Sequence, residues 1–423
     1  MIKADLLVKN AGQLVTVAGH SKKAKRGDAL AELGLIAGGA VAAMQGVIVA
    51  VGSTAEVLEQ IQLTAESTVV DARGKVVLPG LVDPHTHIVF AGSRESEFEM
   101  KIKGAAYLDI LAGGGGILST VRATRAASEA QLVEKGKTYL EEMLAQGTTT
   151  AEVKSGYGLT VADELKQLRA IQTLQKMQPV DLVPTFLGAH AIPEEYRDDP
   201  GSFIELIIEE MLPAVKNGNL AECCDIFCEE GVFSVAESRR ILEAARRLGF
   251  ALKLHADEIV PLGGAELAAE MQALSADHLV AATPRGIEKL AASSTVAVLL
   301  PATTFCLMGE KYAPAREMIE AGVTVALASD FNPGSSPVNS LPVVMGIACR
   351  QLKMTPAEAL SAVTINAAHA IGRAAEVGSV EVGKKADLVI FDAVDYRSIA
   401  YRFGTNLVET VIKSGQPVAG GVR

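Results

Sequence analysis

The sequence predicts an α/β protein built on a (β/α)8, TIM-like barrel, with a small β-sandwich domain formed by both ends of the chain. In the centre of the chain, eight short apolar runs alternate with helical patterns, as expected for parallel strands joined by helices. The two ends instead contain strand patterns separated by turn residues. The 423 residues are 49% hydrophobic and have a mean hydropathy of +0.27, which is enough to bury a large core.

Residues 1–75 are predicted to form the first part of the β-sandwich domain. Apolar runs at Asp5–Val8, Leu14–Val17 and Val47–Val51 are separated by turn residues. The uncharged stretch Leu33–Val51 is long enough to span a bilayer. Its glycines divide it into two short strands, so we interpret it as a hairpin of a protein without a membrane segment. The first ten residues lack the apolar core of a signal peptide.

Residues 76–375 are predicted to form the barrel. A capping box at Ser234 and Glu237, and threonines before prolines at Thr283 and Thr355, mark helix starts. The alternative is a doubly wound open sheet, but no GxGxxG motif follows an early strand. The eight runs are Leu81–His87, Thr148–Lys154, Asp181–Leu187, Asp225–Cys228, Ala251–His255, Ser275–His278, Val296–Leu300 and Thr324–Asp330.

Residues 376–423 return to the strand pattern of the first segment. Leu388–Phe391 and Leu407–Ile412 are the strand candidates. We expect them to complete the β-sandwich domain begun by residues 1–75.

Charge and cysteine content exclude some classes of partner and compartment. The net charge of −11 argues against a nucleic-acid partner, because binding a phosphate backbone requires basic patches. Five cysteines form an odd, partly clustered set, which predicts reduced thiols of the cytoplasm rather than a disulfide framework. The cluster Cys223–Cys228 lacks the second ligand pair that a zinc site would need.

Polar side chains close several of the predicted strands. His85 and His87 lie two residues apart on an extended backbone, so both should point to the same side. His255 and Asp330 end the fifth and eighth runs, and barrel strands present their C-terminal ends at one rim. Three imidazoles and a carboxylate from these positions predict one metal site with an open position for water. His278, which ends the sixth run, could add a ligand or act as a base.

Two acidic residues lie close to these histidines in the sequence. Glu258 follows His255 by three residues, and this proximity favours an acid–base role over that of a solvated loop carboxylate. Asp277 precedes His278 directly, so the two side chains should point in opposite directions. A local Asp277–His278 couple is therefore not expected.

Several motifs resemble those of a known family. LPGLVDPHTH at Leu78–His87 resembles the first-strand motif of the amidohydrolase superfamily. HTHIVFAGSRESEF, a glycine run followed by ILSTVRATR, EVKSGYGL, FLGAHAIP, HADE, SADHL and SDFNPGS keep the order found in one branch of that superfamily. That branch opens the imidazolone ring in histidine degradation, and the resemblance covers nearly the whole chain.

The resemblance implies hydrolysis of the cyclic amide C–N bond of 4-imidazolone-5-propanoate to N-formimino-L-glutamate, in a homodimer. It implies one zinc or iron ion per chain, held by His85, His87, His255 and Asp330. Catalytic roles are implied for Glu258, His278 and Asp330. Substrate contacts are implied for Arg94, Tyr157, His190, Glu258, Asn332, Gly334 and Ser335, with Arg94 and Tyr157 on the propanoate carboxylate.

Three features need a separate interpretation. Arg94 lies among three glutamates and by itself would suit a surface ion pair, although a guanidinium also pairs bidentately with a carboxylate.

Some superfamily members bridge two metals with a carboxylated lysine on the fourth strand. Lys154 ends the second run instead, which predicts a single metal and a structural cation behind it. Gly113–Gly116 lacks the lysine of a phosphate loop and is interpreted as a flexible active-site loop.

Two other functions remain open from the sequence. The first is a different amidohydrolase, such as a deaminase of aromatic amines or a hydantoinase-like enzyme, which would differ only around the substrate. The second is a non-enzymatic scaffold on the same fold, which would be expected to lose metal ligands. All four ligand positions are occupied by suitable residues here.

Overall fold

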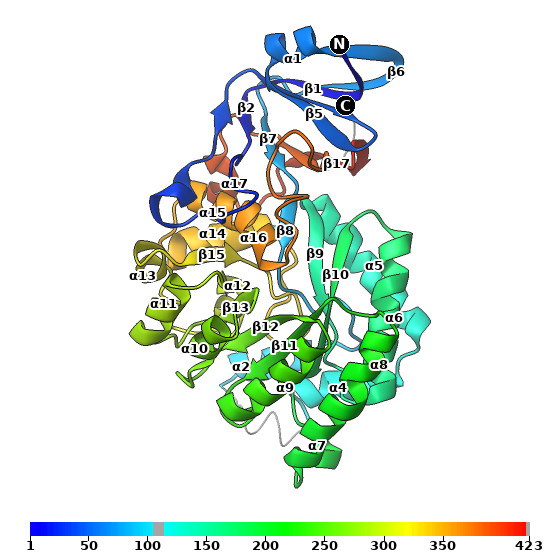
Figure 1. Ribbon diagram of the computed structural model, residues 1–423, viewed down its shortest axis with the longest axis vertical. Helices are drawn as coiled ribbons and strands as arrows, with labels where there is room; N and C mark the ends of the chain where they lie inside the picture. Colours follow the sequence, from blue (N-terminus) through cyan, green and yellow to red (C-terminus); the bar gives the residue numbers. More distant parts are fainter. Residues whose placement is uncertain (105–113, 420–423) are drawn as a thin grey trace.

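The computed structural model describes residues 1–104 and 114–419, and its larger part is a barrel of eight parallel strands (Figure 1). Each strand pairs with its neighbour in sequence, in the order β15-β14-β13-β12-β11-β10-β9-β8. The strands are β8 (Leu81–Asp83), β9 (Thr148–Lys154), β10 (Asp181–Ala189), β11 (Cys223–Cys228), β12 (Ala251–Ala256), β13 (Ser275–His278), β14 (Val296–Leu299) and β15 (Thr324–Leu327). Each of the eight predicted runs therefore contains a strand, but the first and last strands end earlier than predicted, at Asp83 and Leu327.

The first and last strands meet beyond their ends. Thr86 and Phe331 form a parallel bridge, Asp330 N donates to His85 O at 3.0 Å, and His87 N donates to Phe331 O at 2.9 Å. His85 and Asp330 thus lie just past β8 and β15 rather than on them. β8 stops at Asp83 because Pro84 follows, and a proline cannot donate to a strand ladder.

Helices surround the barrel strands (Figure 1). Ser234 Oγ accepts from Glu237 N, and Glu237 Oε2 accepts from Ser234 N, which confirms the predicted capping box. Thr283 and Thr355 cap their helices as predicted. The helices are α2 (Glu95–Ile102), α4 (Ile117–Ala126), α5 (Glu129–Ala145), α6 (Val161–Met177), α7 (Pro200–Leu206), α8 (Leu212–Asn217), α9 (Val235–Arg247), α10 (Gly264–Glu270), α11 (Pro284–Ala291), α12 (Pro301–Cys306), α13 (Ala315–Glu320), α14 (Leu341–Gln351), α15 (Pro356–Ala362) and α16 (Ile365–Ala370). A π-helical turn, Ile207–Met211, joins α7 to α8.

Both ends of the chain build the smaller domain from two sheets. The four-stranded sheet, β5-β4-β1-β6, contains β1 (Ile2–Ala11), β4 (Gly39–Met44), β5 (Val47–Ser53) and β6 (Ile61–Asp71). The six-stranded sheet, β18-β17-β16-β7-β2-β3, contains β2 (Gln13–Val15), β3 (Leu35–Ile36), β7 (Val76–Pro79), β16 (Leu388–Phe391), β17 (Val408–Lys413) and β18 (Gln416–Ala419). Helices α1 (Thr54–Gln60) and α17 (Arg397–Tyr401) complete it.

The two sheets share one apolar core, which confirms the predicted sandwich. Leu6 and Val41 of the first sheet pack in the same buried cluster as Val77 and Leu388 of the second. β4 and β5 are antiparallel around a turn at Gln45 and Gly46, so the predicted hairpin is also confirmed. Among the described residues, no helix is both long and apolar enough to cross a bilayer.

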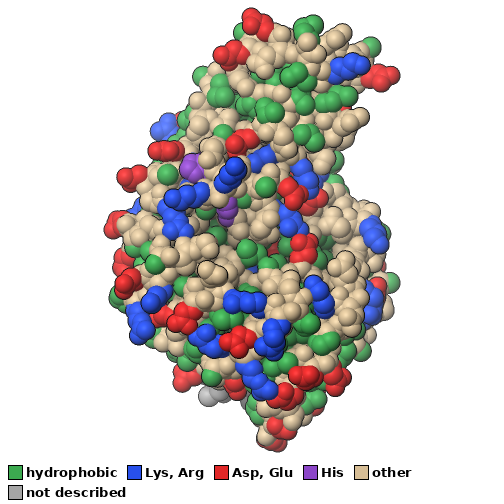
Figure 2. Space-filling model, in the orientation of Figure 1, with side chains coloured by type: hydrophobic (Ala, Val, Ile, Leu, Met, Phe, Trp, Pro, Cys, Tyr) green, Lys and Arg blue, Asp and Glu red, His purple; other side chains and the backbone are tan. Residues whose placement is uncertain are grey.

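The surface in view carries charges of both signs. Figure 2 shows Lys and Arg side chains interspersed with Asp and Glu side chains over this face of the barrel. Such mixing is the ordinary pattern of a solvated protein surface.

Candidate active site

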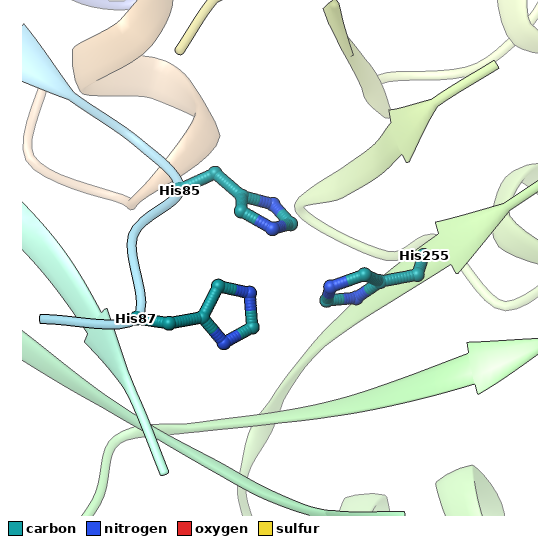
Figure 3. Close-up of side chains that lie close together, drawn as sticks. All are labelled: His85, His87 and His255. Carbon is teal, nitrogen blue, oxygen red and sulfur yellow. The ribbon is translucent and has the colours of Figure 1, made fainter. Parts of the chain in front are cut away.

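The four predicted metal ligands come together at one rim of the barrel. His85 and His87 follow β8, His255 lies near the end of β12, and the three rings face one another (Figure 3). Ring centroids are 4.5 Å apart for His85 and His255, and 5.3 Å apart for His85 and His87. Asp330 Oδ1 lies 3.4 Å from Nε2 of both His85 and His87. The geometry is that of a single small site.

The donor atoms fit a metal ion. One nitrogen from each of the three histidines lies within 4.8 Å of the others. The Nε2 atoms of His85 and His255 are buried and have no hydrogen-bond partner among the described residues. Burying an unpaired polar atom is unfavourable, and a zinc or iron ion would remove that cost by coordination.

Burial also sets suitable protonation states. It lowers the pKa of His85 to about 3 and that of His87 to about 4, so both rings are neutral at neutral pH. Burial alone would raise the pKa of Asp330, but contacts with His85 and His87 hold it well below its ordinary value. Thr303 Oγ1 donates to Asp330 Oδ2 at 2.7 Å, which leaves Oδ1 facing the histidines. Neutral imidazoles and an ionised carboxylate are a cation-binding set.

Two buried carboxylates orient the histidines from behind. His85 Nδ1 donates to Asp277 Oδ2 at 2.6 Å, and Asp225 Oδ2 lies 3.1 Å from His255 Nδ1. The hydrogen bond at His85 Nδ1 directs Nε2 of that ring toward the predicted metal position, and the Asp225 carboxylate lies on the Nδ1 side of His255. Asp277 indeed contacts His85 rather than its neighbour His278. We did not predict either role, although a carboxylate inside a buried strand is an available signal.

The Lys154 ammonium pairs with the buried carboxylates behind the histidines. Its Nζ lies 2.6 Å from Asp225 Oδ2, 2.7 Å from Glu152 Oε1 and 3.8 Å from Asp277 Oδ2. Burial alone would lower the pKa of Lys154, but these carboxylates raise it above its ordinary value. The side chain is a paired ammonium behind the histidines, in the place where a structural cation was predicted.

Glu258 and His278 face each other beside the ligands. Glu258 Oε1 lies 3.6 Å from His278 Nδ1, and the His278 ring centroid is 5.1 Å from that of His255. Burial raises the pKa of Glu258, and the positive charge of a protonated His278 opposes that rise. His278 has a φ of 76°, an unusual conformation that places its ring at the rim.

Arg94 and Tyr157 lie at the same rim. Arg94 precedes α2, and its Nε and Nη2 lie 2.9 Å and 2.8 Å from Glu97 Oε2. The Tyr157 ring is 5.8 Å from that of His87. Burial raises the pKa of the Tyr157 hydroxyl, while the nearby Arg94 charge acts in the opposite direction. The Tyr157 hydroxyl is therefore protonated and can donate a hydrogen bond close to the Arg94 charge.

His190 lies against the metal ligands. Its ring stacks on His87 at 5.0 Å, and its Nδ1–H donates to Gly156 O at 3.0 Å. Burial holds the pKa of His190 well below its ordinary value. The neutral ring presents Nε2 as an acceptor.

Asn332 organises the loop that follows Asp330. Its Nδ2 donates to Asp330 O at 2.7 Å and to Ser335 Oγ at 2.8 Å, and its Oδ1 accepts from the backbone N–H groups of Gly334 and Ser335, both at 2.8 Å. These bonds occupy the Asn332 amide within the loop. A direct contact between Asn332 and a substrate stays a prediction.

Gly334 packs directly on Arg94. A Cβ atom at Gly334 would lie 1.8 Å from Arg94 Nη1. A cavity of 1130 Å³ opens beside this contact and is lined in part by Arg94, Asn332 and Gly334. This cavity therefore has room for a small acid next to the guanidinium, and none of the four predicted metal ligands lines it.

The cysteine cluster lies apart from the predicted ligands, and the predicted role of the glycine run stays a prediction. Cys223, Cys224 and Cys228 are buried free thiols on β11. No cysteine belongs to the metal-capable groups that the described residues form. Of the glycine run Gly113–Gly116, the first residue lies outside the described residues, and Gly116 N donates to Glu97 Oε1 at 3.0 Å.

Known proteins resemble this chain over almost its full length. The model of the Amidohydrolase family matches residues 76–418. The imidazolonepropionase of Alkaliphilus oremlandii (strain OhILAs) is 56% identical over 414 residues, 98% of each chain. That of Shouchella clausii (strain KSM-K16) is 54% identical over 420 residues, 99% of this chain and 94% of the relative.

Solved structures share the fold at lower identity. An adenosine deaminase from Xanthomonas campestris with bound zinc has a TM-score of 0.71 at 21% identity, covering 99% of this chain and 94% of that one. A 5-methylcytosine deaminase from Klebsiella pneumoniae has a TM-score of 0.74 at 17% identity, covering 99% and 98%. The full-length relatives are much closer in sequence than these deaminases. The chain belongs to the imidazolonepropionase family of the amidohydrolases.

Proposed function

We propose that this enzyme hydrolyses the ring amide of 4-imidazolone-5-propanoate, using one zinc or iron ion per chain. The observation that carries the proposal is the convergence of His85, His87, His255 and Asp330 at the rim that also holds Arg94. One active site would then combine a metal ion for hydrolysis with the Arg94 guanidinium, which would bind the substrate carboxylate.

The metal position is formed by neutral imidazole nitrogens and one carboxylate oxygen. When bound, the ion supplies Lewis acidity toward a carbonyl and lowers the pKa of water. Asp277 and Asp225 keep His85 and His255 turned toward it. Ligand type alone suits both zinc and iron.

The remaining residues bind the substrate. Arg94 pairs with the propanoate carboxylate, and the Tyr157 hydroxyl donates to the same group. His190 accepts from a ring N–H. The loop at Gly334 and Ser335, held in shape by Asn332, closes the other side of the ring.

Glu258 and His278 handle the protons. Glu258 takes a proton from the attacking water, and its raised pKa brings it closer to the operating pH, as a general base requires. His278 donates to the carbonyl oxygen as negative charge develops there. Glu258 then delivers the proton to the departing ring nitrogen, so that one water is added, one C–N bond breaks, and N-formimino-L-glutamate is formed.

A substrate panel tests this activity. The purified, metal-loaded enzyme is expected to turn over 4-imidazolone-5-propanoate and not guanine, cytosine or hydantoin. Chelation should abolish turnover, and zinc or iron should restore it. Ammonia release from guanine or cytosine alone would identify a deaminase. Elemental analysis that finds no ion in the purified chain, with no turnover, would favour a scaffold.

We also propose a cytoplasmic homodimer. The five free cysteines suit a reducing compartment, and the dimer rests on the family resemblance. Light scattering on the purified protein should give twice the chain mass of 44.2 kDa. A mass of one chain at micromolar concentration would contradict the dimer.

A further inference from the structure

The loop that carries Glu258 is held from a neighbouring strand. This loop runs from Ala256, the last residue of β12, to Gly264, the first of α10. Glu229 follows β11 directly and is 1% exposed. Its Oε2 accepts from Ile259 N at 2.8 Å, and its Oε1 accepts from Val260 N at 3.3 Å. The two residues after Glu258 are thus tied to one buried carboxylate.

Both ends of this link are anchored. Glu229 N donates to Phe233 O at 3.2 Å, so the backbone of Glu229 lies in a closed turn. At the far end of the loop, Asp257 accepts from the backbone N–H groups of Gly263, Gly264 and Ala265, each at 2.9 Å. The backbone that follows Glu258 is thus hydrogen-bonded to a buried carboxylate at two places.

Side-chain packing anchors the loop at Leu262, which contacts the main core, but not at the residue directly after Glu258. Ile259 is 70% exposed, so burial of its side chain contributes little to the loop. Among the described residues, the one backbone hydrogen bond within 258–262 is from Leu262 N to Val260 O, at 2.9 Å. Among the described residues, the Glu229 carboxylate therefore supplies the hydrogen bonds to the two backbone N–H groups that follow Glu258.

We propose that Glu229 is a positioning residue that keeps the Glu258 carboxylate facing His278. A carboxylate suits this role because both of its oxygens accept, whereas a glutamine would turn an N–H₂ group toward one backbone N–H. This inference rests on the proposed function, in which Glu258 moves the proton. Glu229 itself touches neither the metal ligands nor the substrate groups described above.

A double-mutant cycle tests the coupling. Glu229→Gln should lower kcat by about 100-fold, the order of loss caused by a misplacement of about 1 Å. KM and metal content should stay as in the wild type. In a Glu258→Gln background, Glu229→Gln should lower kcat no further, because its effect passes through Glu258. An equal loss of kcat in both backgrounds, or no loss in either, would overturn the proposal.

Glu164 offers a matched control. It is also a buried glutamate that holds a site loop, since it accepts from the backbone N–H groups of Gly156, Gly158 and Leu159. That loop carries Tyr157 instead of Glu258. Glu164→Gln should therefore raise KM, and its effect should add to that of Glu258→Gln. If Glu164→Gln and Glu229→Gln gave the same kinetic pattern, a general loss of rigidity would replace the positioning role.

Hydrogen exchange provides a measurement that needs no turnover. The amides of Ile259 and Val260 should be protected in the wild-type enzyme and should exchange at least about tenfold faster in Glu229→Gln. Exchange at the rate of an open loop in the wild type would overturn the link even if the variant failed to fold. If imidazolone propanoate were not a substrate, the proposed function would fail while this measurement still reported on the loop.

Discussion

At the residue scale, Arg94 is held in place before any substrate arrives. Two of its nitrogens contact Glu97, which also accepts from Gly116 N. Glu97 therefore fixes the direction of the guanidinium. Loss of one charge-assisted pair typically costs about 1.5–3 kcal/mol, or about 10- to 100-fold in binding.

Arg94→Ala should raise KM for imidazolone propanoate by about 10- to 100-fold and leave the metal content unchanged. Arg94→Lys should recover part of the loss, because it keeps the charge without the planar fork. Steady-state kinetics with elemental analysis check both variants. Loss of the metal ion in Arg94→Ala would instead show that Arg94 is structural.

Glu258→Gln should lower kcat by about 10²- to 10⁴-fold, the usual contribution of a general acid–base group. Steady-state kinetics of the variant measures this loss.

The pH dependence of the activity follows from the raised pKa of Glu258. A base must be ionised, so activity should fall as the pH drops through that pKa, above the range of an ordinary glutamate. An acid limb in the variant identical to that of the wild type would assign the titration to another group.

The candidate metal ligands could be selected from the sequence because their type and their place at strand ends are both visible in it. Residues that position other site residues were harder to predict. Asp225 orients His255, and Glu229 reaches Ile259, only because β11 lies next to β12. Such contacts depend on which residues of neighbouring strands lie side by side, and this pairing was not predicted from the sequence.

At the element scale, three loops of the rim are held in part by buried side chains that accept from backbone N–H groups. Glu164 binds the loop with Tyr157, Glu229 the loop with Glu258, and Asn332 the loop after Asp330. Helix starts were predictable because a cap is local, as at Ser234. The end of β8 was placed too late, because Pro84 breaks the ladder while the chain beyond it remains extended enough to bring both histidines to the site.

Gly334→Ala tests the fit of one such loop. The new Cβ would lie 1.8 Å from Arg94 Nη1, so the guanidinium must move. Because the end of a long side chain can shift, we expect a raised KM and a nearly unchanged melting temperature. Kinetics and thermal unfolding check this. A lower kcat at unchanged KM would place the effect on the chemical step instead.

At the scale of the whole molecule, ion pairs join the barrel to the smaller domain. Asp181 at the start of β10 accepts from Lys413 Nζ of β17 at 2.7 Å and from Lys385 Nζ at 3.0 Å. Burial alone would raise the pKa of Asp181, but the two lysines lower it. A lowered folded-state pKa stabilises the protein above the unfolded pKa, and this contribution is lost as the pH falls through the folded value.

Asp181→Asn should reduce stability at pH 7 by about 2 kcal/mol, the scale of a charged hydrogen bond. The difference from the wild type should be constant above about pH 5 and narrow below about pH 4. Denaturant unfolding at several pH values measures it. Glu129→Gln, which removes an exposed pair with Arg169, is the control and should cost less than about 1 kcal/mol. A pH-independent difference would exclude the ionic contribution.

The pairing of β7 with β16 has a consequence for biosynthesis. About 300 residues separate these adjacent strands, so at ribosomal rates of about 5–20 residues per second β7 waits tens of seconds for its partner. During that interval its edge is open to other nascent chains. The barrel can close earlier, because each of its strands pairs with the next one to be made. Yield in the cell should therefore depend on chaperones that shield the N-terminal segment until translation ends.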